Sequence, residues 1–189
     1  MIIYFYGNRG CGKTLSSVIL TDLFNKLYNA QKKKCIIFTN VEMDLKDHEI
    51  FDFFNPEFQN TKQPKIFLFD EMDKYSDSRN SMSSLNKFIG YSVSLSRKTN
   101  TDYIFTTQFF NSLDKRLRVF ADFIILPTKS KNKIEWEIYN QNNGNLKTIT
   151  LNLDISKYYK RYDSYYLTLD KIQKDLPKLK ELVKKFNLK

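Results

Sequence analysis

The clearest pattern for chemistry in this sequence is a glycine-rich stretch at residues 7–14. It fits the pattern G-x-x-x-x-G-K-[ST] of a phosphate-binding loop. The glycines allow successive backbone N–H groups to turn toward an anion, and the helix that follows adds its positive end. We expect Lys13 to reach the β- and γ-phosphates of a nucleoside triphosphate and the Thr14 hydroxyl to bind Mg²⁺. The candidate nucleotide-binding residues are Gly7, Asn8, Arg9, Gly10, Cys11, Gly12, Lys13 and Thr14.

Two adjacent acidic residues form the second candidate group. Asp70 and Glu71 follow the apolar run 66–69, which is typical of a strand buried on both faces of a parallel sheet. A carboxylate at the end of such a strand can hold Mg²⁺ through its water shell. A neighbouring carboxylate can orient and deprotonate the attacking water. We therefore assign Asp70 to the metal and Glu71 to the general base.

Further polar residues could act on the terminal phosphate. Gln108 follows the predicted strand 103–107, where its amide can contact the γ-phosphate or the attacking water. Arg97, Arg116 and Arg118 flank the last two strands of the predicted sheet. One of them can act as an arginine finger that stabilises developing charge on a neighbouring subunit's nucleotide. The sequence does not choose among the three, and for each one taken singly a surface or phosphate contact is the favoured interpretation.

Alternating strands and helices must position these residues. A helix is predicted from the spacing of Leu15, Val18, Ile19, Leu23, Leu27 and Tyr28, and another over 81–96. Such alternation predicts an α/β fold in which a parallel sheet with right-handed crossovers is covered by helices on both faces. The predicted strands are 2–6, 35–39, 66–69, 103–107 and 123–126, the last one stopped by Pro127.

The pattern changes after Pro127. Residues 134–139 and 146–153 are β-prone and flank Asn143-Gly144, which predicts a hairpin. A helix is expected over 169–188, with an interruption at Pro177. Residues 42–64 are polar and look irregular. We therefore predict an ATPase-type core over 1–128 and a basic C-terminal extension over 129–189, formed by the hairpin and helix and packed on the core.

Composition narrows the class of partner. The chain of 189 residues suits one α/β domain with an appendage, and its net charge is +10. Residues 129–189 carry a basic surplus of 7, against 3 for residues 1–128. This surplus suggests that the partner is a polyanion, most simply nucleic acid, although a lysine-rich solvated surface explains it equally well.

The sequence also indicates the compartment. No apolar run approaches the roughly 20 residues of a membrane span, and no signal peptide is visible. The two cysteines are expected to be reduced thiols, as in the cytoplasm.

The order of the motifs resembles that of the zonula occludens toxin-like ATPases of the FtsK/HerA superfamily, which includes DNA translocases and viral genome-packaging ATPases. The resemblance covers residues 1–128 and extends faintly to Tyr162-Asp163-Ser164. The segment 113–122 is similar to the part of that family that follows its sensor glutamine. The motifs that carry the resemblance are the loop at 7–14, T-N-V at 39–41, F-D-E at 69–71, S-R-K-T-N-T-D at 96–102 and T-T-Q at 106–108.

The resemblance implies a sheet of order 5-1-4-3-2, with Glu71 as catalytic acid and Gln108 as sensor. It implies ATP and Mg²⁺ as cofactors, a ring of six or five subunits, double-stranded DNA threaded through it, and a capsid or membrane-associated viral partner. Many relatives carry a transmembrane segment, and none is predicted here, which favours a packaging motor in the host cytoplasm or virion. The leading hypothesis is an ATP-hydrolysing DNA translocase. An ATP-dependent assembly or scaffold switch and a small-molecule kinase stay open as alternatives.

Overall fold

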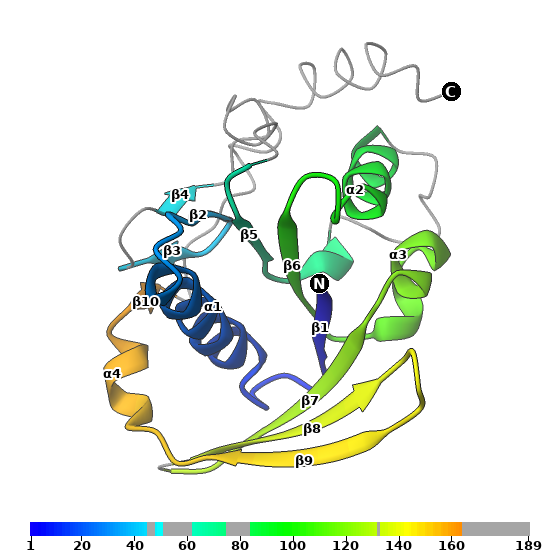
Figure 1. Ribbon diagram of the computed structural model, residues 1–189. Coiled ribbons are helices and arrows are strands. Elements are labelled where there is room, and N and C mark those ends of the chain that lie inside the picture. Colours follow the sequence, from blue (N-terminus) through cyan, green and yellow to red (C-terminus); the bar gives the residue numbers. More distant parts are fainter. Residues whose placement is uncertain (45–47, 51–61, 75–83, 132, 164–189) are drawn as a thin grey trace.

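A single mixed sheet of eight strands forms the centre of the molecule (Figure 1). The computed structural model describes residues 1–44, 48–50, 62–74, 84–131 and 133–163. The strand order is β4-β2-β5-β6-β1-β7-β8-β9, parallel from β4 to β7 and antiparallel from β7 to β9. These strands are β1 (Ile2–Tyr6), β2 (Ile36–Thr39), β4 (His48–Ile50), β5 (Lys65–Phe69), β6 (Thr101–Thr107), β7 (Phe123–Lys129), β8 (Ile134–Asn140) and β9 (Leu146–Leu151).

The five strands predicted from the sequence are β1, β2, β5, β6 and β7. Counted along the chain, they lie in the order 5-1-4-3-2, so that order is confirmed. Because they are parallel, the segments that follow them reach the same edge of the sheet. The phosphate-binding loop after β1, Asp70 after β5 and Gln108 after β6 therefore share the carboxyl edge.

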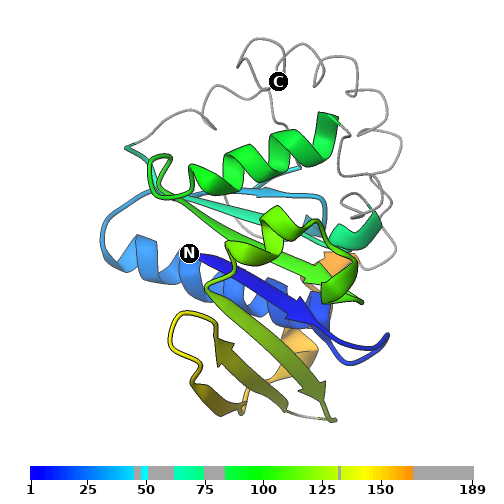
Figure 2. The same ribbon diagram turned by 90° about the vertical axis from the view of Figure 1, so that its right-hand side faces the viewer.

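Helices cover both faces of this sheet, as expected. Helix α1 (Lys13–Ala30) lies on one face, and α2 (Ser84–Ser94) and the short α3 (Lys115–Val119) lie on the other (Figures 1 and 2). Alternate strand residues face opposite layers. The α2 and α3 side is filled mainly by rings: Tyr4, Phe67, Phe69, Tyr103 and Phe105. The α1 side is largely aliphatic: Ile3, Ile37, Ile66, Leu68 and Ile104.

The predicted apolar face of α1 is wrong in its second half. Leu23 and Leu27 are exposed, at 38% and 54% of their surface. Phe24, which was not predicted, packs against the core in their place, and the predicted Tyr28 packs there as expected. The two pairs lie one residue apart, about 100° around the helix. The leucines therefore point away from the sheet when the aromatic residues face it.

Strand β7 runs through Pro127 to Lys129, so the prediction that Pro127 ends the strand is wrong. The pairing of β7 with β1 stops at Ile125, while Pro127 lies opposite Trp136 of β8. Pro127 thus has a sheet neighbour on one side only, where a missing N–H is tolerated. Beyond it, β8 and β9 pair around a turn that includes Gly144 (φ +71°).

Residues after 128 share the core with the residues before it. The Trp136 ring is buried, packs edge-on against Phe5 with a centroid distance of 5.5 Å, and donates its indole N–H to Ser16 Oγ at 3.0 Å. Because Ser16 lies on α1, this bond joins β8 to the helix that begins in the phosphate-binding loop. The last part of the described chain is likewise packed on α1.

Two short elements near the end of the described chain, and a short strand that pairs with one of them, were not predicted. Helix α4 (Ile155–Tyr159) packs on α1, and β10 (Tyr162–Asp163) pairs antiparallel with β3 (Glu42–Met43). The expectation that 42–64 is irregular is therefore wrong where it meets β3 and β4. The predicted helix 169–188 lies outside the described residues, as do the first three residues of the predicted helix 81–96, whose described part is α2.

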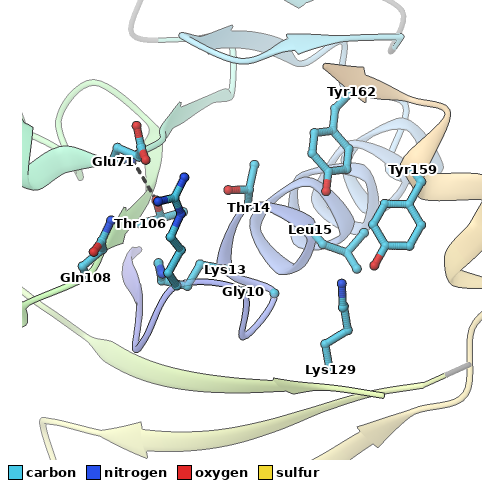
Figure 3. A pocket seen from close by; sticks show the side chains of 12 residues that line it. Gly10, Lys13, Thr14, Leu15, Glu71, Thr106, Gln108, Lys129, Tyr159 and Tyr162 are labelled. Carbon is cyan, nitrogen blue, oxygen red and sulfur yellow. Dashed lines mark hydrogen bonds between the residues drawn. The ribbon is translucent and has the colours of Figure 1, made fainter. Parts of the chain in front are cut away.

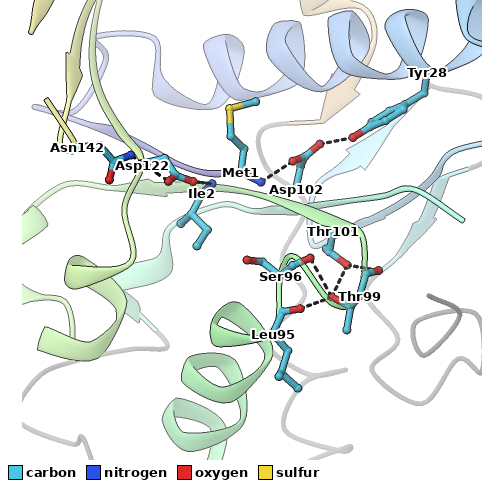
Figure 4. A network of polar contacts seen from close by, with 10 residues as sticks. All are labelled: Met1, Ile2, Tyr28, Leu95, Ser96, Thr99, Thr101, Asp102, Asp122 and Asn142. Atoms are coloured by element: carbon cyan, nitrogen blue, oxygen red, sulfur yellow. Dashed lines mark hydrogen bonds and ion pairs between the residues drawn. The ribbon is translucent and has the colours of Figure 1, made fainter. Parts of the chain in front are cut away.

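At the opposite, amino edge of the sheet, two aspartate carboxylates accept hydrogen bonds from neighbouring segments (Figure 4). Asp122 accepts a hydrogen bond from the backbone N–H of Ile2 at 2.8 Å. Asp102 accepts from the amino group of Met1 at 2.6 Å and from the Tyr28 hydroxyl at 2.5 Å. These bonds connect β1, β6, β7 and α1 far from the phosphate-binding loop. No helix within the described residues has the length and apolar character needed to cross a membrane.

Candidate nucleotide-binding site

A cavity of about 200 Å³ opens at the carboxyl edge of the sheet (Figure 3). It brings together Lys13, Thr14, Glu71 and Gln108, which the sequence placed on three separate segments. Gly7 and Asn8 do not line it; instead their carbonyl oxygens accept hydrogen bonds from Lys13. The residues that line the cavity are Arg9, Gly10, Gly12, Lys13, Thr14, Leu15, Glu71, Thr106, Gln108, Lys129, Tyr159 and Tyr162.

The glycines give the loop its shape. Gly12 precedes α1 with φ +100°, a left-handed conformation that disfavours residues with a side chain. A Cβ there would lie 3.2 Å from Lys129 Cβ and 3.3 Å from Ile134 Cδ1, so β7 and β8 pack directly against the loop. Lys13 Nζ donates to the carbonyls of Gly7 at 2.9 Å and Asn8 at 3.1 Å. Its ammonium is thereby held inside the curve of the loop, where it can exchange carbonyl for phosphate oxygens.

Asp70 lies beneath the loop and contacts it directly. Its carboxylate accepts hydrogen bonds from Thr14 Oγ1 at 3.0 and 3.1 Å and from Thr106 Oγ1 at 2.6 Å. Burial raises the pKa of Asp70, an effect that the two threonine hydroxyls oppose and the nearby Glu71 carboxylate reinforces. A cation bound beside the Asp70 carboxylate would oppose this upward shift, because it stabilises the ionised form.

Asn40 and Thr106 hold the backbone around the two acidic residues. The Asn40 side chain donates to the Asp70 carbonyl at 3.0 Å and accepts from the Asp70 N–H at 2.7 Å. The next residue, Glu71, has φ +54°, which is unusual for a residue with a side chain. Its N–H donates to Thr106 Oγ1 at 2.8 Å. One threonine hydroxyl therefore fixes both the carboxylate of Asp70 and the backbone turn that sets the position of Glu71.

The end of β6 is tied to the segment after β5. The Gln108 N–H donates to Asp73 Oδ1 at 3.2 Å, and Figure 3 shows Gln108 and Glu71 on the same side of the cavity. An amide and a carboxylate thus face the end of the cavity where a terminal phosphate would be attacked. Their catalytic roles stay predictions.

The donor atoms around Asp70 suit Mg²⁺. This ion takes one or two protein oxygens and completes its shell with water and phosphate oxygens. The Thr14 hydroxyl and the Asp70 carboxylate, 3.0 Å apart, offer that set. No group of three or more His, Cys, Asp or Glu residues suited to a metal occurs in the described part of the chain. The Thr14 and Asp70 oxygens fit Mg²⁺, and their role as its ligands stays a prediction.

None of the three candidate arginines lines the described cavity. Arg97 is exposed in the turn before β6, at the amino edge of the sheet. Arg116 binds Asp114 through Nη2 at 2.7 Å and Nε at 3.0 Å, and this pairing lowers the pKa of Asp114. Arg118 Nε donates to the carbonyl of Leu113 at 3.1 Å. A role for any of them as an arginine finger requires a neighbouring subunit and stays a prediction.

Sequence reasoning missed five residues of the site. Asn40 and Thr106 stand inside the quoted motifs T-N-V and T-T-Q, so a signal existed, but it did not reveal their hydrogen bonds. Tyr162 stands inside the quoted stretch Tyr162-Asp163-Ser164, which did not reveal its place at the cavity. Lys129 and Tyr159 carry no local signal, because Tyr159 reaches the cavity only through the packing of α4 on α1.

Comparisons with known proteins agree with this geometry. The model of the family described as ATPase family associated with various cellular activities (AAA) matches residues 3–128. No curated protein matches the chain. Solved structures share the fold at low sequence identity. The N-terminal domain of zonular occludens toxin from Neisseria meningitidis superposes with a TM-score of 0.59 at 17% identity, covering 86% of this chain and 98% of that one.

Two further structures are similar. The genome packaging NTPase B204 from Sulfolobus turreted icosahedral virus 2, in complex with ATP-gammaS, gives a TM-score of 0.59 at 16% identity and covers 80% of this chain and 98% of that one. EssC (ATPases 2 and 3) from Geobacillus thermodenitrificans gives 0.55 at 12% identity over 96% of this chain and 44% of that one. At these identities the likeness shows the fold alone.

Proposed function

This chain belongs to the AAA family of ATPases, and from that membership we propose that it is an ATP-hydrolysing DNA translocase, the genome-packaging motor of a virus or mobile element. The observation that carries the proposal is the convergence of Lys13, Thr14 and Glu71 on one cavity above a partly buried Asp70. This arrangement has the parts needed to bind a triphosphate and to direct water at its terminal phosphate.

Each residue has a defined task in hydrolysis. Lys13 binds the β- and γ-phosphate oxygens and offsets their charge, and Thr14 and Asp70 hold Mg²⁺, which neutralises charge on the phosphates when bound. Glu71 orients the attacking water and accepts its proton. Gln108 contacts the γ-phosphate or that water and reports whether the phosphate is present. The bond between Gln108 and Asp73 links this contact to the segment after β5.

DNA as the partner is supported by two independent features. One similar structure is named a genome packaging NTPase and another is the N-terminal domain of zonular occludens toxin. The chain also carries a net charge of +10, with most of the surplus in residues 129–189. A basic surface attracts the phosphate backbone without regard to sequence, and this attraction falls steeply as salt rises. A motor that moves along DNA needs such sequence-independent contacts.

The active assembly is proposed to be a ring of six or five subunits around double-stranded DNA, docked on a capsid or a membrane-associated viral partner. None of Arg97, Arg116 and Arg118 lines the described cavity of their own chain, which is in keeping with an arginine supplied by the neighbour. A monomer then binds ATP but hydrolyses it slowly, because developing charge on the γ-phosphate lacks its partner.

The decisive experiment measures ATP turnover with and without double-stranded DNA over a series of salt concentrations. The proposal expects DNA to stimulate turnover at low salt and the stimulation to fade as salt rises. Glu71→Gln serves as the hydrolysis-deficient control. An ATP turnover rate that is the same with and without DNA at low salt would refute the proposal of a translocase. An assembly switch would keep its function in Glu71→Gln, and phosphorylation of a small acceptor would identify a kinase.

A further inference from the structure

Three residues of the cavity have no task in hydrolysis. Lys129, at the end of β7, and Tyr159 and Tyr162, from α4 and β10, line the cavity together with the loop. In Figure 3 they lie with Leu15 on one side of Thr14, whereas Glu71 and Gln108 lie on the other. The cavity therefore has two chemically different ends, one acidic and polar and the other aromatic and basic.

The direction of a bound nucleotide follows from these ends. The γ-phosphate must lie near Glu71, because the water that attacks it is oriented there. Lys13 and Thr14 occupy the middle of the cavity and contact the phosphate chain. A nucleoside triphosphate is extended, so its sugar and base lie beyond Thr14. They therefore reach the aromatic end of the cavity.

The two tyrosine rings are suited to a planar partner. Their centroids are 6.5 Å apart with the planes inclined by 32°. Tyr159 leaves 46% of its surface exposed, so part of its ring is free to be covered. Burial, with the nearby Tyr159 and Asp70, raises the pKa of Tyr162 to about 12, so its hydroxyl stays a neutral donor at physiological pH. Lys129 Nζ, 5.2 Å from the centre of the Tyr159 ring, places a positive charge beside the rings.

A buried ion cluster holds the tyrosines in place. Asp22 on α1 is 4% exposed. Its carboxylate accepts a hydrogen bond from the Tyr158 hydroxyl at 3.0 Å and lies 3.4 Å from Arg161 Nη1. Tyr158 and Arg161 thus face α1, while the residues that follow each of them, Tyr159 and Tyr162, face the cavity. The pairing of β10 with β3 fixes Tyr162 from the other side.

We propose that Tyr159 and Tyr162 bind the nucleoside end of the triphosphate, with the base stacked on a tyrosine ring and Lys129 beside the sugar and α-phosphate. Aromatic rings in proteins commonly bind bases in this way. The inference rests on the nucleotide-binding and hydrolysis parts of the proposed function, since the role of Glu71 sets the direction of the nucleotide, and it is independent of DNA translocation. It assigns to the segment 155–163 the task of completing a site that begins at residue 7.

The test separates binding of the nucleoside from binding of the phosphates. Calorimetric titration of the whole chain uses two probes, ATP and inorganic tripolyphosphate, each with Mg²⁺. Tyr159→Ala should raise the Kd for ATP about 5- to 150-fold, the range expected for loss of a base–aromatic stack. The Kd for tripolyphosphate should change less than about twofold, because that ligand has no base. Tyr162→Ala should behave similarly, and Tyr159→Phe should keep ATP affinity.

Matched controls make the outcome unambiguous. Tyr139 on β8 is exposed to a similar degree, 41%, and does not line the cavity, so Tyr139→Ala should bind both probes normally. Lys13→Ala should weaken both. The inference is overturned if Tyr159→Ala and Tyr162→Ala both bind ATP as the wild type does, or if they lose both probes equally. If the wild type binds neither probe, the nucleotide-binding premise itself falls.

Discussion

Replacement of Thr106 by valine would test how the site is held together. Valine has nearly the same shape but lacks the hydroxyl, which is fully buried. That hydroxyl donates to Asp70 Oδ1 at 2.6 Å and accepts from the Glu71 N–H at 2.8 Å. The substitution therefore removes one bond to a carboxylate and takes the Thr106 acceptor away from a partly buried backbone N–H. Thr106→Ser keeps the hydroxyl and loses only a methyl group, so it is the matched control.

The size of the effect follows from these two bonds. A hydrogen bond to a charged group contributes about 1.5–3 kcal/mol, and an unpaired buried N–H costs about 1–3 kcal/mol. The two effects share one hydroxyl and are not fully additive, so we expect Thr106→Val to lose about 3 kcal/mol of unfolding free energy. In a domain of this size that corresponds to a fall in Tm of about 6–12 °C. Thr106→Ser should lose about 1 kcal/mol.

Urea unfolding followed by circular dichroism, without nucleotide, measures this difference. The Thr106 hydroxyl stabilises the ionised form of Asp70, so its contribution is present above the Asp70 pKa and declines as pH falls through it. The gap between Thr106→Val and the wild type should therefore narrow at acid pH. The reasoning fails if Thr106→Val and Thr106→Ser are equally stable at neutral pH, or if the gap widens in acid.

Four other substitutions give distinct expectations. Lys13→Ala should weaken ATP binding about 10- to 100-fold, the equivalent of a charged hydrogen bond, in a calorimetric titration. Glu71→Gln should lower turnover about 10²- to 10⁴-fold and leave the Kd for ATP nearly unchanged in equilibrium binding. Burial raises the pKa of Asp70, so the ion-free protein loses stability as pH rises through that pKa. Asp70→Asn should accordingly melt above the wild type at neutral pH, with the difference vanishing in acid, when Tm is followed against pH. Asp22→Ala removes the acceptor of Tyr158 and should cost about 1–3 kcal/mol in urea unfolding, with weaker binding of ATP than of tripolyphosphate. Unchanged ATP affinity in Asp22→Ala would show that α4 does not position the tyrosines.

The sheet was predictable because its strands are local features. Residues 66–69 form a continuous apolar run, which is typical of a strand that is covered on both faces in a parallel sheet. The strand order came from the resemblance of the motifs, not from the run itself. Pro127 shows the limit of local reasoning. Whether a proline ends a strand depends on which of its sides has a neighbour, and that depends on where β1 stops pairing.

The placement of the phosphate-binding loop beside the two acidic residues was predictable for a similar reason. Residues 7–14 are contiguous, and the geometry that they need is set by their own glycines. Asp70 and Glu71 follow directly from the strand before them. Thr106 was overlooked because a threonine in a strand is usually a neutral β-former. Only its distance from Asp70 reveals that it holds both acidic residues in position.

The sequence by itself determined that a phosphate-binding loop and a pair of acidic residues meet at one sheet edge, because short-range backbone rules fix each of them. The tertiary structure alone decided what lies at the other end of the cavity. Tyr159 lies 145 positions after Thr14 in the sequence. It reaches the cavity because a buried aspartate on α1 accepts a hydrogen bond from the tyrosine next to it. Such a contact joins two distant segments through packing and charge, and neither segment carries a pattern that announces the other.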